Sequence, residues 1–158
     1  MPHFSGERTP IHDPRARGAF FGLDLTHTRA DLFRAVLEGI AAGTAHVLET
    51  YREVGAAPAV VLAVGGGTGN EVWLQATSDL GGVTQLVRER TIGASYGDAF
   101  LAAVAIGNAA PDAIGRWNPV ARTVAPRRVP AYARQYPLWK ELYLRTRELA
   151  HDLADGWA

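Results

Sequence analysis

The stretch VVLAVGGGTGNEVW, residues 60–73, decides the fold of this chain. Its opening residues are apolar and largely β-branched, without polar alternation, and they predict a strand over 59–64 that is covered on both faces in a parallel sheet. Glycines follow at once, and a helix is predicted from Asn70 to a stop at Gly81. A glycine-rich turn between such a strand and a helix lies at the carboxyl edge of the sheet, where α/β proteins bind their ligands.

Strands and helices alternate on both sides of this turn, which predicts one layered α/β domain over residues 1–158. A chain of 158 residues, 47% hydrophobic and 20% charged, is long enough for one core and too short for two. The best-marked element is a long amphipathic helix that begins with a capping box of Thr28 and Asp31 and stops at Gly55. The shorter predicted elements are strands at 19–25 and 83–88 and a helix at 94–107.

The carboxyl-terminal part is less regular. Four prolines interrupt 108–136, which predicts an irregular connector. A last helix is predicted over 137–155, with Pro137 at its first position. This helix carries an apolar stripe that is expected to pack back on the domain body. The stripe consists of Leu138, Leu142, Leu149 and Leu153.

The composition argues against several classes of function. Lys plus Arg and Asp plus Glu both number 16, so the net charge is zero and no electrostatic field attracts nucleic acid or an anionic membrane. The absence of cysteine excludes disulfides, thiolate metal sites and a cysteine nucleophile, and agrees with a cytoplasmic protein. No apolar run reaches membrane-spanning length, and no signal-peptide pattern opens the chain. The five histidines are scattered without ligand spacing, so no metal site is predicted.

The residues of the glycine turn allow several interpretations. The simplest is a strand-to-helix turn that needs positive φ angles. A methyltransferase that uses S-adenosylmethionine is another, because VLAVGGGTG (61–69) resembles the first motif of that class and Glu89 could bind a ribose. Such a domain needs several more strands than the one that remains. A dinucleotide-binding fingerprint fails, because Asn70 occupies the position of its third glycine.

A further interpretation comes from the neighbours of the turn. GAFFGL and DLFRAVLE, which open and close 18–38, resemble the second signature of the FGGY carbohydrate kinases. The stretch at 5–23 is similar to the sequence that precedes this signature in xylulokinase-like members. GGGTGNEVWLQATSDLGG (65–82) resembles the adenosine motif of the family, and 93–107 its following helix. The motifs occur in the family's order, so the chain resembles roughly the last third of such a kinase, a segment of its C-terminal domain.

This resemblance implies a fold and a nucleotide. Members have a pair of actin-like, ribonuclease H-like domains that close on ATP and a sugar, with Mg²⁺ held mainly through the upstream part. The turn would then contact the adenosine and α-phosphate of ATP. The residues expected to do so are Gly65, Gly66, Gly67, Thr68 and Asn70. Thr68 and Asn70 depart from the commoner small or hydroxyl residues of the motif, and Asp98 stands where alanine is usual.

The resemblance also implies what lies outside this segment. The catalytic aspartate, the phosphate loop and most sugar contacts of the family lie upstream, so no catalytic residue is assigned, and Asp13, Asp24 and Asp31 have loop or capping contexts. The expected function is phosphorylation of a sugar by ATP, inactive in this piece alone. A non-catalytic remnant or interaction module is the alternative. The expected partners are the sugar, the N-terminal kinase domain and a second copy that covers the bare sheet edge.

Overall fold

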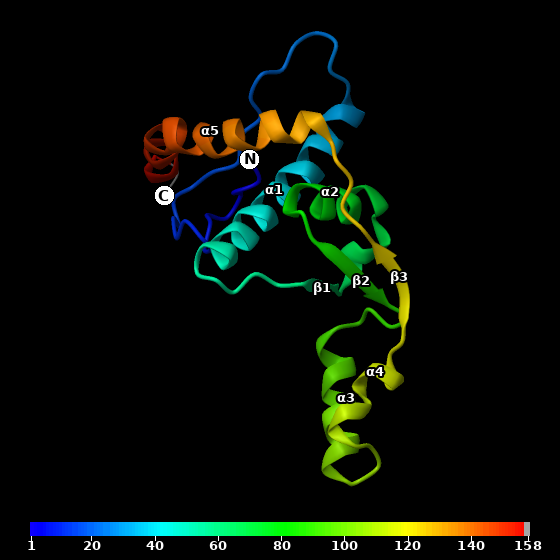
Figure 1. Cartoon of the computed structure of the whole chain (residues 1–158). Coiled ribbons are helices and arrows are strands. Elements are labelled where there is room, and N and C mark those ends of the chain that lie inside the picture. The colour runs from blue at the N-terminus through cyan, green and yellow to red at the C-terminus, as the bar shows by residue number, and fades with distance from the viewer. Residues whose placement is uncertain (157–158) are drawn as a thin grey trace.

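The computed structural model describes residues 1–156 as a small sheet with helices around it (Figure 1). The helices α3 and α4 project from one end of the sheet, away from α1 and α5 (Figure 1). Among the described residues, no helix combines the length and the hydropathy that crossing a lipid bilayer demands. In chain order the elements are α1 (Arg29–Glu53), β1 (Val60–Ala63), η1 (Gly66–Gly69), α2 (Glu71–Gly81), β2 (Thr84–Arg88), α3 (Ala94–Ala105), η2 (Pro111–Ala113), α4 (Ile114–Trp117), β3 (Val120–Val124) and α5 (Pro130–Asp155).

Within these residues, three strands form one sheet in the order β1-β2-β3. β1 and β2 are parallel and are joined by α2, which confirms the strand-helix-strand unit predicted around the glycine turn. β3 pairs antiparallel with β2 on its other side. The buried side chains of Leu74, Val87 and Val124 form a core cluster between α2 and the sheet, and Ala63 of β1 packs against it.

β1 is covered on one face only, so the prediction of a strand buried on both faces is wrong. Side chains alternate between the faces of a strand, and those of Val60, Leu62 and Val64 are 45%, 53% and 59% exposed. β1 is also the outer strand of the sheet, with β2 as its single neighbour among the described residues. Its apolar composition therefore marks a surface that the described part of the chain leaves uncovered.

The long helix α1 forms as predicted. The side chain of Thr28 accepts from the backbone of Asp31, and the Asp31 side chain accepts from the backbone of Thr28, which is the expected capping box. Gly55 follows the end of the helix with φ of +74°. α1 packs on α2, and Leu48 of α1 lies against Gly81 of α2. The buried residues of α1 also include the small Gly39, Ala41, Ala42 and Ala45.

Two regions differ from the predictions. Residues 19–25 contain no strand, because the described chain places no strand beside them with which to pair. The connector at 108–136 is not irregular, since it holds η2, α4, β3 and the start of α5. β3 forms because β2 offers an open edge, and prolines flank the strand rather than interrupt it. The last helix begins at Pro130, which takes the first-turn position expected of Pro137, and Pro137 lies inside it.

Polar groups attach α5 to the rest of the molecule, whereas the predicted leucine stripe stays largely exposed. Glu49 of α1 accepts from the Tyr136 hydroxyl at 2.9 Å and from the Lys140 ammonium at 2.8 Å. Nearer the end of α5, Asp13 of the amino-terminal loop accepts from the Tyr143 hydroxyl at 2.8 Å and from His151 Nε2 at 2.7 Å. The register of α5 along α1 and this loop is therefore set by directional bonds.

The Asp13 carboxyl titrates far from its usual range because of this arrangement. Burial raises its pKa, but hydrogen bonds from His151, Tyr143 and the Arg15 backbone amide outweigh burial and lower the pKa to about 2. A carboxyl with a lowered folded-state pKa stabilises the fold above its ordinary pKa, 3.8, and loses that contribution as the pH falls through about 2.

We therefore predict that Tyr143→Phe destabilises the protein in a pH-dependent way. At pH 7 the free energy of unfolding should fall by about 1–2 kcal/mol, since a bond to a charged group is lost. The difference from the wild type should shrink between pH 4 and pH 2, measured by chemical denaturation. Tyr96→Phe is the matched control, because the Tyr96 hydroxyl donates to the Trp117 carbonyl, which does not titrate. A Tyr143→Phe difference that stays constant down to pH 2 would contradict the assignment.

Candidate functional site

The glycine turn lies where β1 and β2 end. Gly65 follows β1 with φ of +89°, a conformation that L side chains rarely adopt. Its amide donates to the Thr91 carbonyl at 2.6 Å, which joins the segment after β1 to the segment after β2. The short 3₁₀ turn η1 then leads into α2. The turn therefore lies at the carboxyl edge of the parallel pair, as the sequence predicted.

The two polar side chains of the turn hold its shape. The Thr68 hydroxyl donates to the Gly65 carbonyl at 2.7 Å, and the Thr68 amide donates to the same oxygen at 3.2 Å. Asn70 caps α2, because its side-chain oxygen accepts from the Trp73 amide at 3.0 Å. The predicted site residues are thus brought together in one turn, with Thr68 and the Asn70 oxygen directed to the backbone of the turn and helix.

The glycines of the turn differ in what requires them. Gly65 is required by its positive φ angle. Gly67 is required by packing, since a Cβ there would overlap the indole ring of Trp73, with Cε3 at 2.9 Å. Gly66 and Gly69 have neither requirement: both lack a positive φ angle, and a Cβ at either position would meet nothing within 4 Å. Both glycines are exposed, so they leave room for something outside the described chain to approach the backbone.

The residues predicted for the site do not include two that the structure places at the turn, Gly69 and Arg122. Gly69 stands among the quoted glycines, and what distinguishes it is the open space at its Cβ position. Arg122 reaches the turn from β3: its Nη2 donates to the Thr68 carbonyl at 3.2 Å, and its Nη1 donates to Glu71 Oε1 at 2.9 Å. No sequence signal placed this arginine near the turn, because the strand that carries it was predicted to be irregular.

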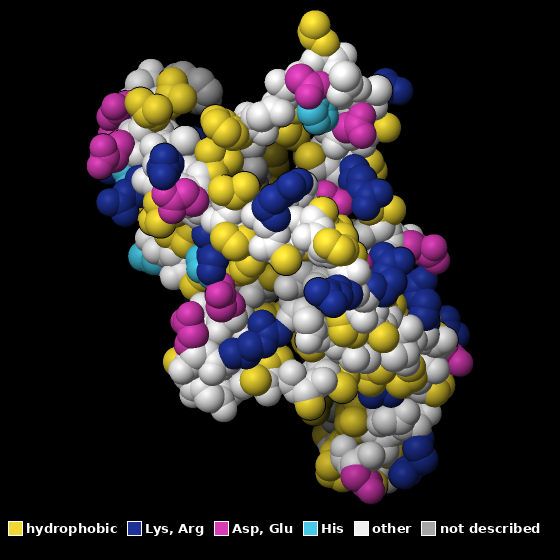
Figure 2. Space-filling model, turned by 45° about the horizontal axis from the view of Figure 1, so that its top comes forward, with side chains coloured by type: hydrophobic (Ala, Val, Ile, Leu, Met, Phe, Trp, Pro, Cys, Tyr) yellow, Lys and Arg dark blue, Asp and Glu magenta, His cyan; other side chains and the backbone are white. Residues whose placement is uncertain are grey.

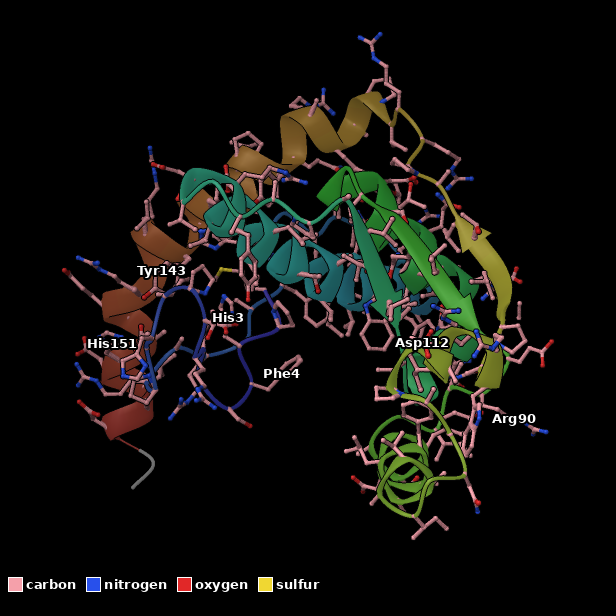
Figure 3. All side chains as sticks on the ribbon, turned by 60° about the horizontal axis from the view of Figure 1, so that its bottom comes forward. His3, Phe4, Arg90, Asp112, Tyr143 and His151 are labelled. Carbon is pink, nitrogen blue, oxygen red and sulfur yellow. The ribbon has the colours of Figure 1, made fainter. Side chains whose placement is uncertain are left out.

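Other polar clusters of the molecule lie away from the turn. Figure 3 shows His3, Tyr143 and His151 together near α5, at the other end of the molecule from Arg90, which follows β2 next to the turn. A cavity of about 1040 Å³ lies between the amino-terminal segment, α1 and α5, with Phe20 and Trp139 among its lining residues. Within residues 1–156, no group of three or more His, Asp or Glu side chains could hold a metal ion.

Comparison with known proteins gives this geometry a context. Residues 1–106 match the model of the FGGY family of carbohydrate kinases, C-terminal domain. The xylulose kinase of Bacillus subtilis (strain 168) is 32% identical over 152 residues, which are 94% of this chain and 30% of that kinase. The xylulose kinase of Escherichia coli (strain K12) is 40% identical over 108 residues, 66% of this chain and 22% of that kinase.

The solved structures agree with the sequence relatives. The crystal structure of xylulose kinase from Rhodospirillum rubrum superposes with a TM-score of 0.80 at 29% identity, covering 96% of this chain and 31% of that one. Nearly the whole of this chain therefore matches these kinases, but it spans only about a third of their length.

Because the glycines of the turn have different surroundings, the same substitution to alanine should have different effects on the stability of the protein at Gly67 and at Gly66. Gly67→Ala should lower the free energy of unfolding by about 1–3 kcal/mol, because the added methyl group must displace Trp73. Gly66→Ala is the matched control one residue away, and it should leave this free energy unchanged or raise it by up to about 1 kcal/mol. Chemical denaturation of both variants measures the difference. Equal destabilisation by the two substitutions would show that the turn packs differently.

Proposed function

Because this chain belongs to the FGGY family of carbohydrate kinases, we propose that it forms the nucleotide-binding part of a kinase that phosphorylates a sugar with ATP. Its fold is the mixed α/β, actin-like and ribonuclease H-like fold of sugar kinases. The observation that carries the proposal is the open backbone at Gly66 and Gly69, at the carboxyl edge of a parallel strand pair. Glycine at these positions suits the close approach of a flat base or a phosphate oxygen.

The residues of the turn fit an adenosine group. Gly66 and Gly69 present bare backbone, while Gly65, Thr68 and Asn70 maintain the turn through backbone conformation and internal hydrogen bonds. The start of α2 beside them carries the partial positive charge of a helix amino terminus, which favours a phosphate. ATP, when bound, supplies the phosphoryl group that a sugar hydroxyl accepts. The part of this chain in that reaction is to bind and orient the nucleotide.

The acid-base chemistry of phosphoryl transfer is not assigned to this segment. A kinase needs a carboxylate near the attacking hydroxyl. Asp13 is buried and accepts from Tyr143 and His151, and Asp31 caps α1. Asp24 accepts from the amide and hydroxyl of Thr26 in a loop. Each of these carboxylates already has a structural role, so we assign no catalytic base and no Mg²⁺ ligand among them. The remaining two-thirds of such a kinase would provide these groups and most contacts to a sugar such as xylulose.

We predict that the isolated chain binds ATP through the open face of the turn. Gly66→Val should weaken ATP binding at least about tenfold, because its side chain fills the space in which the nucleotide would lie. Gly43→Val is the matched control, since a Cβ at Gly43 of α1 also meets nothing within 4 Å. Isothermal titration of ATP into the wild type and both variants provides the measurement. Equal affinities for the wild type and Gly66→Val would exclude the turn as the site.

A second measurement separates the kinase from an interaction module. The release of ADP from ATP and xylulose is followed for this chain alone and with the upstream two-thirds of the Bacillus subtilis xylulose kinase added as a separate piece. ADP release that depends on both pieces supports the kinase. An absence of ADP in both cases would leave the non-catalytic alternative for this polypeptide.

We further propose that a segment of another polypeptide covers the exposed face of β1. In the whole kinase this would be the upstream part, and in the isolated chain a second copy. The outer strand offers unpaired backbone groups next to the exposed side chains of Val60, Leu62 and Val64. Apolar side chains are also exposed on the projecting α3–α4 end (Figure 2). An uncovered parallel edge strand favours association with another strand.

The isolated chain should therefore self-associate in a concentration-dependent way, as measured by sedimentation velocity. Leu62→Lys should shift the chain toward the monomer, because a charge on this face opposes its burial. Leu25→Lys is the control: Leu25 is fully exposed in a loop, so the change adds the same charge away from β1. A wild-type chain that remains monomeric at high concentration would contradict self-association.

A further inference from the structure

The third strand brings an arginine to the candidate site. β3 lies outside residues 1–106, the part of the chain that matches the family model. Arg122 pairs with Val87 of β2, but Arg88 pairs with Val120, so the register shifts at this point and Ala121 is the extra residue. A bulge of this kind changes the direction in which neighbouring side chains point. Arg122 lies on the same face of β3 as Val124, which packs against α2.

From this position Arg122 contacts the turn and the helix after it. Its guanidinium donates to the Thr68 carbonyl at 3.2 Å and to the Glu71 carboxylate at 2.9 Å. The side chain of Glu71 is 83% exposed, and ion pairs so exposed contribute little to stability. The Thr68 carbonyl, in contrast, belongs to the backbone of η1 itself. The bond to Thr68 is therefore the contact through which Arg122 can act on the turn.

The turn is thus held at both ends by distant parts of the chain. The Gly65 amide bonds the Thr91 carbonyl at one end, and Arg122 bonds Thr68 at the other. Gly66 lies between these two hydrogen bonds, and Gly69 follows Thr68 directly. Both glycines have open space at their Cβ positions. The hydrogen bonds of a short 3₁₀ turn have poor geometry, so a further bond from the neighbouring strand restricts the backbone conformations that this four-residue turn can adopt.

We infer that Arg122 is a positioning residue for the nucleotide site: it fixes the turn in the shape that leaves Gly66 and Gly69 facing the ligand. This inference rests on the proposed function. Arg122 does not itself need to touch the nucleotide, because its effect passes through the Thr68 carbonyl. A planar guanidinium with several donors can hold Thr68 and Glu71 together, and a lysine ammonium at the end of its flexible stem reproduces this only in part.

The test measures ATP affinity and amide hydrogen exchange for the wild type, Arg122→Ala, Arg122→Lys and Glu71→Gln. Arg122→Ala should weaken ATP binding about tenfold and speed the exchange of the turn amides at 66–70, without nucleotide present. Arg122→Lys should recover part of both losses, since it keeps a donor for Thr68. Glu71→Gln removes the charged partner and leaves the bond to Thr68, so its ATP affinity should stay within about twofold of the wild type.

The readouts separate this inference from the proposed function. A wild-type chain that does not bind ATP overturns the proposed function, and exchange at 66–70 still decides whether Arg122 restrains the turn. Unchanged exchange there in Arg122→Ala overturns the inference. Uniform acceleration across the whole protein also overturns it, because that result denotes a general loss of stability. If Arg122→Ala does not fold, the comparison of Glu71→Gln with Arg122→Lys decides. Equal weakening of ATP binding by these two variants would show that the ion pair between Arg122 and Glu71 causes the effect, and this would overturn the inference.

Discussion

The parallel pairing of β1 with β2 is the constraint on which the rest of the site depends. Two parallel neighbours need a crossover, so α2 returns along the sheet and both strands end at the same edge. The hydrogen bond from the Gly65 amide to the Thr91 carbonyl joins the two chain segments that leave this edge. The glycine turn, the start of α2 and the start of α3 are consequently neighbours, and a ligand bound to the turn would lie close to all three.

The sequence-based predictions succeed where a local pattern and the tertiary environment agree. The apolar run before Gly65 forms β1, Asn70 caps α2, and the capping box at Thr28 begins α1. Each of these signals acts through residues within one turn of helix or one strand, so it can be found without knowing the fold. The location of the turn at the carboxyl edge followed from the same signals. The role of each glycine did not, because it depends on what lies next to an absent Cβ.

The two failures that concern strands have a common cause, which is that strands depend on partners distant in sequence. Residues 19–25 have the composition of a strand but no described strand beside them, whereas 120–124 form β3 between two prolines because β2 is available. Pairing of this kind is decided by the whole sheet and not by intrinsic propensity. The contact of Arg122 with the turn could not be predicted from the sequence for the same reason, since it requires β3 to form and to pair in its observed register.

Polar and apolar surfaces have different roles in this molecule. Hydrogen bonds to Glu49 and Asp13 set the position of α5, because each needs a defined distance and direction. The leucines of α5 and the outer face of β1 stay exposed, although apolar side chains would stabilise the fold more if they were buried. The polar bonds therefore determine the internal arrangement of α5, and the apolar faces remain open for contacts with other polypeptide segments.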